Sequence, residues 1–187
     1  MERQLPRGPH RLAREEVLAS QRGRMLEAIA EVVALRGYGA ATVADVIDYA
    51  GVSRRTFYEH FRDKEDCFLA AYDAGVEVLM ATMRAGEPVR AYLETLSAEP
   101  AFARTFLIEI GAAGPRAIAR RQEVHEAFAA MIGDDLESLA AVGALNEVVT
   151  REVAAGRTAQ LPALKAPLTS VLARLRPPRR RGRAATP

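Results

Sequence analysis

The segment GVSRRTFYEHF, residues 51–61, holds the polar side chains whose types and spacing are best suited to chemistry. Its apolar residues recur every four or five positions, which is the spacing of one buried helix face. The polar residues are then left for the opposite face, and they are Arg54, Arg55, Thr56, Tyr58 and His60. Arginine can fork onto guanine or a phosphate, and hydroxyl groups bond phosphates. This face is suited either to DNA or, as most charged helix faces are, to water alone.

No other group of residues in the sequence offers catalysis. The three histidines, His10, His60 and His125, are far apart, and no cluster of His, Cys and acidic residues has the spacing of metal ligands. Cys67 stands alone and is expected to be a small buried residue. The stretch 111–117 lacks the Lys-Ser/Thr of a phosphate loop, and we interpret it as a helix junction. The sequence therefore predicts neither an enzyme, nor a metal site, nor a cofactor.

Composition favours a helical globular protein. The chain has 187 residues, of which 49% are hydrophobic and 27% charged, and Ala, Leu, Glu and Arg dominate over alternating β-branched runs. No apolar run approaches the roughly 20 residues that cross a bilayer. The N-terminus lacks the apolar core of a signal peptide, and a single cysteine excludes an internal disulfide. We expect an all-α, cytoplasmic protein without membrane association.

The net charge of +2 conceals a segregation along the chain. Residues 1–64 hold 11 basic and 9 acidic side chains, and residues 174–187 hold 6 arginines and no acid. The middle, residues 65–173, holds 9 basic and 15 acidic side chains. A nucleic acid would be repelled by the middle of the chain and attracted to its two ends.

Two helices are expected before residue 51. The apolar residues of 22–36 fall on one helical face, and the glycines of 37–39 end that helix. Thr42 can cap the next helix, and Asp45 three residues later resembles a capping box. Gly51 then supplies a sharp turn.

Two further caps follow the turn. Ser53 can cap the helix of residues 54–61, and Asp63 can cap a long helix over 64–85. Helix, short glycine turn and helix form the geometry of a helix-turn-helix, in which the second helix enters the major groove. The apolar face would fix that helix to the first, leaving its polar face free for bases and phosphates.

The sequence from Arg22 to Asp73 closely resembles the DNA-binding domain of TetR/AcrR-family regulators. The Gly-Tyr-Gly turn, the Thr-capped helix, AGVSRRTFY, HF and DKE occur in the family's order and spacing. The resemblance implies a dimer that binds a palindromic double-stranded operator, most often as a repressor, and responds to a small effector. It also implies phosphate contacts from Thr42 and Lys64. The expected DNA-binding residues are Thr42, Ser53, Arg54, Arg55, Thr56, Tyr58, His60 and Lys64.

The second half offers candidates for an apolar ligand cavity beside the kink-prone stretch 111–115. The expected lining residues are Phe102, Phe106, Glu109, Ile110, Phe128 and Met131. Polar residues that could also face the cavity are Arg116, Arg120, His125 and Asn146. The effector would be small and mostly apolar. For each of these residues taken singly, ordinary core or surface packing is the competing interpretation.

The sequence divides into four parts. We expect a flexible arm over 1–20, the helix-turn-helix domain over 21–66, a ligand-binding and dimerisation domain over 67–176, and a basic disordered tail over 177–187. The segments LESLAAVGALNEVVTREVAAG and LKAPLTSVLARL would pair as the dimer interface, as the resemblance implies.

Two points remain open at this stage. The connections near 84–88 and 132–135 are short for the family, so either the protein is trimmed there or residues are absent from the numbering. The rival function is a DNA-binding protein that is constitutive or indifferent to sequence, which the basic tail would favour.

Overall fold

The computed structural model describes residues 14–133 and 135–175, and within these ranges every regular element is a helix. In chain order they are α1 (Arg14–Arg36), α2 (Val43–Ala50), α3 (Arg54–His60), α4 (Lys64–Ala85), α5 (Pro88–Ala98), α6 (Pro100–Leu107), the 3-10 helix η1 (Glu109–Ala112), α7 (Pro115–Ala130), α8 (Leu136–Ala154), the 3-10 helix η2 (Thr158–Leu164) and α9 (Lys165–Leu175). The predicted all-α class is confirmed. No helix in the described part is long and apolar enough to cross a membrane.

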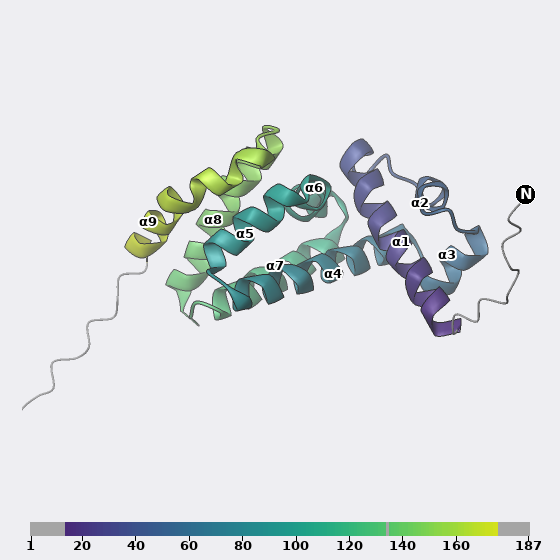
Figure 1. Cartoon of the computed structure of the whole chain (residues 1–187), viewed down its shortest axis with the longest axis horizontal. Helices are drawn as coiled ribbons and strands as arrows, with labels where there is room; N and C mark the ends of the chain where they lie inside the picture. The colour runs from purple at the N-terminus through teal and green to yellow at the C-terminus, as the bar shows by residue number, and fades with distance from the viewer. Residues whose placement is uncertain (1–13, 134, 176–187) are drawn as a thin grey trace, which may run out of the picture.

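The helices gather at two ends of an elongated molecule (Figure 1). Helices α1, α2 and α3 lie at one end, and α5, α8 and α9 lie at the other. Helix α4 runs from the first group to the second, with α7 beside it. One continuous helix therefore links the two halves of the chain, and the predicted boundary at residue 66 falls inside it.

The helix-turn-helix forms where its caps predict. The Thr42 hydroxyl accepts from the backbone of Asp45, and the Asp45 carboxylate accepts in return, which completes a capping box. Gly51 ends α2 with φ of 61°, a left-handed conformation that glycine adopts without a steric penalty. Ser53 caps α3 and Asp63 caps α4 through their side-chain oxygens. These local predictions are confirmed.

Apolar packing fixes α3 against its neighbours. Phe57 is fully buried, and Phe61 lies 5.6 Å from it between ring centroids. Both belong to a core that includes Met25 and Ile29 of α1 and Val46 of α2. Burial of one large apolar side chain contributes about 1.5–3 kcal/mol. Helix α3 has only two turns, so this packing rather than helix propensity holds it in place.

The start of α1 corrects the sequence prediction. The helix begins at Arg14, so residues 14–20 are helical and do not belong to a flexible arm. The prolines that favour an arm, Pro6 and Pro9, lie before residue 10, so they do not prevent a helix from beginning at Arg14. Residues 1–13 and the tail predicted over 177–187 lie outside the described residues.

Proline sets the helix starts of the second half. Pro88, Pro100 and Pro115 occupy the first positions of α5, α6 and α7, where a missing N–H costs no hydrogen bond. Between α6 and α7 the chain makes the η1 turn, and Gly114 has φ of 105°. This is the helix junction that the sequence predicts. Only residues 86 and 87 separate α4 from α5.

Candidate nucleic-acid interface and ligand cavity

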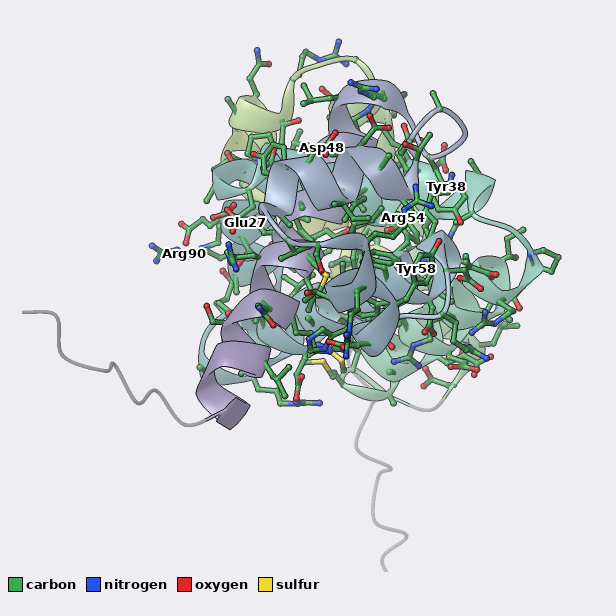
Figure 2. All side chains as sticks on the ribbon, turned by 90° about the vertical axis from the view of Figure 1, so that its right-hand side faces the viewer. Glu27, Tyr38, Asp48, Arg54, Tyr58 and Arg90 are labelled. Atoms are coloured by element: carbon green, nitrogen blue, oxygen red, sulfur yellow. The ribbon has the colours of Figure 1, made fainter. Side chains whose placement is uncertain are left out.

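The outer face of α3 presents Arg54 and Tyr58. Both lie at the end of the molecule opposite α5, α8 and α9, and Figure 2 looks onto that end. Tyr58 is 51% exposed and meets Phe57 edge to face, with ring centroids 5.4 Å apart. The buried Phe57 ring thus supports Tyr58 and leaves its hydroxyl in solvent.

The two adjacent arginines differ in their partners. Arg55 donates from Nε to Glu59 at 2.9 Å, which is an ion pair one helical turn apart. Arg54 is exposed and makes no ion pair or hydrogen bond with the residues that the structure describes. Among the described residues, nothing therefore occupies the donors of the Arg54 guanidinium, and they are available to an outside acceptor.

The hydroxyl groups at the start of α3 bond each other. Ser53 Oγ accepts from the backbone N–H of Thr56 at 3.0 Å, and the two side-chain oxygens lie 2.9 Å apart. Ser53 is exposed and Thr56 is half-buried. Their first role is to begin the helix at a fixed angle, which in turn directs Arg54 outward.

His60 is turned toward the protein. Its Nε2 is buried and, within the described ranges, has no hydrogen-bond partner. Its ring lies 6.2 Å from the Phe61 ring between centroids. His60 was expected to contact DNA, but its Nε2 points away from the outer face of α3.

Lys64 holds the turn between α1 and α2. Its ammonium donates to the carbonyl oxygens of Tyr38 at 2.7 Å and Ala41 at 2.8 Å, and it lies 4.1 Å above the Tyr38 ring centroid. Burial lowers the pKa of this amine. Lys64 thus connects the α1–α2 turn to the start of α4 through two of its three N–H donors. Only the third N–H is left for a phosphate.

Thr42 is also engaged locally. Its hydroxyl donates to the Asp45 carboxylate at 2.7 Å, and Arg36 pairs with the other Asp45 oxygen at 2.8 Å. The hydrogen bonds from Thr42, followed by the charge of Arg36, hold the pKa of Asp45 below its usual value. Thr42 itself is exposed at the start of α2.

Glu109 bridges the two halves of the chain. It is 7% exposed, and its Oε2 accepts from the backbone N–H of Tyr38 at 2.9 Å. Its Oε1 pairs with Arg104 at 3.1 Å. A second contact lies beside it, where the Thr105 hydroxyl donates to the Ala30 carbonyl at 3.1 Å. The α6–η1 segment is thereby hydrogen-bonded to α1 and to the turn that follows it.

A cavity of about 70 Å³ lies among α4, α5, α7, α8 and α9. Its walls are mostly apolar. The lining residues are Met83, Pro88, Val89, Tyr92, His125, Phe128, Met131, Ile132, Ala141, Val142, Leu145, Asn146 and Leu172. The helices expected to form the dimer interface, α8 and α9, contribute part of this wall.

The sequence predicted only part of the cavity wall. Phe128 and Met131 line it, but Phe102, Phe106, Glu109 and Ile110 do not, and this corrects the expectation. The Phe106 ring stacks on Tyr72 at 4.9 Å, Phe102 lies against Gly75 and Ile110 is in the core, while Glu109 bonds the α1–α2 turn. These residues fill the contact between α4 and the α6–η1 segment, so they pack against protein.

The other polar candidates divide in the same way. His125 and Asn146 line the cavity. Arg116 and Arg120 instead pair with Glu65 and Asp73 of α4, at 3.3 and 2.7 Å, in an open polar groove between α4 and α7.

Sequence reasoning missed Tyr92, Leu145 and Leu172 as wall residues. Apolar spacing on α5 and α8 marks a buried face there. It carries no signal that separates a solid contact from a cavity wall. No group of three or more His, Cys, Asp or Glu residues that could hold a metal occurs in the described part of the chain.

Comparison with known proteins connects this geometry to a family. Residues 25–71 match a family model described as bacterial regulatory proteins, tetR family. The HTH-type transcriptional activator FasR of Mycolicibacterium smegmatis is 39% identical over 75 residues, which are 40% of this chain and 32% of FasR. The HTH-type transcriptional repressor KstR2 of Mycobacterium tuberculosis is 45% identical over 47 residues, or 25% of this chain and 24% of KstR2. The matched region spans a third or less of these relatives' length.

Solved structures resemble the whole fold. The fatty acid degradation regulator FadR from Bacillus halodurans has a TM-score of 0.70 and 22% identity, over 84% of this chain and 99% of that one. FadR from Bacillus subtilis, in complex with stearoyl-CoA, has a TM-score of 0.66 and 19% identity, over 80% and 96% of the two chains. At these identities the likeness establishes the fold alone.

Proposed function

Since the chain belongs to the TetR family of bacterial regulatory proteins, we propose that it is a ligand-responsive transcriptional regulator that binds a specific DNA operator through α3. The family is one of regulators and not of enzymes. The DNA-contacting residues proposed from α3 are Arg54, Arg55, Thr56 and Tyr58, with Thr42, Ser53 and Lys64 beside the backbone and His60 in a supporting position.

The observation that carries the proposal concerns α3, which the buried Phe57 fixes to the rest of the domain. On its outer face, Arg54 pairs with no described residue and Tyr58 is exposed. Recognition helices place a few side chains at base edges while the rest of the motif holds the phosphate backbone. An arginine without an internal partner loses no ion pair when it binds a guanine or a phosphate. A rigid support of this kind also lowers the entropy lost on binding.

Operator binding of the full chain tests this proposal at fixed salt concentration. Arg54→Ala should cost about 1–3 kcal/mol, roughly 5- to 150-fold in affinity, if the side chain reads a base. Arg90→Ala is the matched control, because Arg90 is an exposed arginine of α5 that pairs with Glu94, far from α3. Arg54→Ala should then lose affinity and Arg90→Ala should not. Equal affinity of Arg54→Ala and the wild type would refute α3 as the reading element.

The rival function is binding without sequence preference. The same titration, carried out with the operator and with random DNA of equal length, distinguishes the two. A specific regulator prefers the operator by a factor of roughly 10³ or more, whereas a sequence-independent protein binds both alike.

We propose a homodimer formed through α8 and α9. Support comes from exposed apolar side chains on these helices, including Leu136, Leu139 and Val171, and from small residues between them such as Gly143. Two copies related by a two-fold axis fit a palindromic operator with half-sites about 34–36 Å apart. Leu139→Glu should shift the molecular mass in solution toward the monomer. Ile118→Glu, on the exposed face of α7, should leave the mass unchanged.

A small, mostly apolar effector is proposed to occupy the cavity. Helix α4 supports this coupling, because Lys64 at one end clamps the α1–α2 turn and Met83 near the other lines the cavity. An effector that favours one arrangement of the two halves would change operator affinity. The expected sign is repression, relieved by the effector. Since the relatives include an activator and a repressor, a reporter gene fused to the operator measures that sign.

A further inference from the structure

The cavity wall contains no formally charged side chain. None of the residues that line it is Asp, Glu, Lys or Arg. Transfer of an ion into such a site is strongly unfavourable unless a partner of opposite charge or several hydrogen bonds compensate. The wall thus discriminates against a carboxylate or phosphate before any detail of shape is considered.

The three polar residues in the wall offer hydrogen bonds but no fixed charge. The Tyr92 hydroxyl donates to Asn146 Oδ1 at 3.3 Å. Asn146 is 9% exposed, and its amide N–H₂ group makes no hydrogen bond with the described residues. Burial, together with the positive charge of Arg121, lowers the pKa of His125, which keeps this imidazole uncharged at neutral pH. A buried amide donor of this kind is satisfied by an oxygen acceptor.

The size of the cavity also limits the ligand. Its volume is about 70 Å³. An engineered apolar cavity of about 150 Å³ in another protein binds benzene, so the walls here must move apart before a ring of that size can enter. Met83 and Met131 line the cavity, and methionine adapts its shape readily. The ligand is therefore small, or it widens the space between α4 and α7 as it binds.

From the wall, the free amide and the size together, we propose that the cavity takes a small uncharged apolar molecule with one hydrogen-bond-accepting oxygen, which faces the Asn146 amide. Ketones, esters and ethers belong to this class, and carboxylates and phosphate esters do not. The inference rests on the proposed function, in which this cavity holds the effector, and it adds the chemical class of that effector.

Three probes of similar skeleton test the class: cyclohexanone, methylcyclohexane and cyclohexanecarboxylate. Binding to the full chain is followed by the NMR signals of the Met83 and Met131 methyl groups, which report from the cavity wall. Cyclohexanone should bind roughly two- to tenfold more tightly than methylcyclohexane, which is the effect of one neutral hydrogen bond. Cyclohexanecarboxylate should bind more weakly than either. The ranking is measured on the wild-type protein and needs no variant to fold.

Asn146→Leu in a Tyr92→Phe background, compared with Tyr92→Phe alone, then assigns the hydrogen bond. Leucine has a similar volume and no polar atom, and Tyr92→Phe removes the hydroxyl that would otherwise lose its acceptor at Asn146 and become a second donor. The double variant should lose the preference for cyclohexanone while methylcyclohexane still binds. A carboxylate that binds as tightly as the ketone, or a ketone preference that survives in the double variant, would overturn the inference. Absence of binding by all three probes up to their solubility, together with absence of binding by acetone, a ketone small enough to need less widening of the cavity, would overturn it as well. The wild-type operator titration keeps these outcomes apart from the proposed function, because intact operator binding means that only the effector class has failed.

Discussion

Glu109 should stabilise the folded chain through its contact with the α1–α2 turn. It is 7% exposed, and its hydrogen bond to the Tyr38 N–H is 2.9 Å long. A hydrogen bond to a charged group contributes about 1.5–3 kcal/mol. The pair with Arg104 adds less, because that guanidinium side chain is 42% exposed and solvent screens it. We expect Glu109→Ala to lower the free energy of unfolding by about 1.5–3 kcal/mol.

Thermal unfolding followed by circular dichroism measures this loss. For a chain of this size, 1 kcal/mol corresponds to about 2–4 °C, so Glu109→Ala should unfold about 3–12 °C below the wild type. Glu109→Gln keeps an oxygen acceptor for the Tyr38 N–H and should lose less. Glu123→Ala is the control, because Glu123 makes an exposed ion pair with Arg120 that contributes about 0–1 kcal/mol. If Glu109→Ala and Glu123→Ala unfold at the same temperature, the contact between Glu109 and the α1–α2 turn does not stabilise the fold.

Three further predictions concern Tyr72 and Gly75 of α4 and His125 of α7. Tyr72→Phe should raise the free energy of unfolding by about 1 kcal/mol. It removes a buried hydroxyl that lacks a partner among the described residues, and it keeps the ring stacked on Phe106. A variant that unfolds at a lower temperature than the wild type would contradict this. Gly75→Ala places a Cβ 1.9 Å from the Phe102 ring, so an overpacking cost of about 1–3 kcal/mol outweighs the helix-propensity gain of about 1 kcal/mol. The same change in a Phe102→Ala background should stabilise the protein, which a double-mutant cycle measures. Burial lowers the pKa of His125 below 6.5, so the folded state binds fewer protons, and stability is lost as pH falls from about 6.5 through the folded pKa. Denaturant titrations at a neutral and a mildly acidic pH should therefore show that the wild type loses more free energy of unfolding between the two pH values than His125→Gln does. An equal loss in both proteins would mean that His125 does not cause the pH dependence of stability.

The helix-turn-helix was predictable because its signals are local. Thr42, Gly51, Ser53 and Asp63 each determine the chain direction through atoms within a few residues, and all four act in the structure as the sequence predicts. The outward direction of Arg54 follows from the same caps and from the apolar spacing around Phe57.

Partners distant in sequence were not predictable in this way. The sequence places Lys64 at a helix start, but its carbonyl acceptors at Tyr38 and Ala41 lie 26 and 23 residues earlier. Glu109 likewise finds Tyr38 across 71 residues. Apolar periodicity identifies the buried face of a helix but not the neighbour that covers it. For that reason Phe106 was expected in a cavity wall and lies instead against Tyr72.

The energies at the junction of the two halves are comparable to what regulation requires. A tenfold change in operator affinity corresponds to about 1.4 kcal/mol. The hydrogen bond between Glu109 and Tyr38 contributes about as much or more. Loss of this one contact on effector binding would therefore change the free energy between the two halves by enough for a tenfold change in operator affinity. Helix α4, about 33 Å long, gives the route, since Met83 lines the cavity and Lys64 bonds the same turn as Glu109. Glu109→Ala should therefore weaken the response of operator binding to the effector more than it changes operator affinity without the effector. A variant that loses both equally would mean that Glu109 only supports the fold of the DNA-binding end.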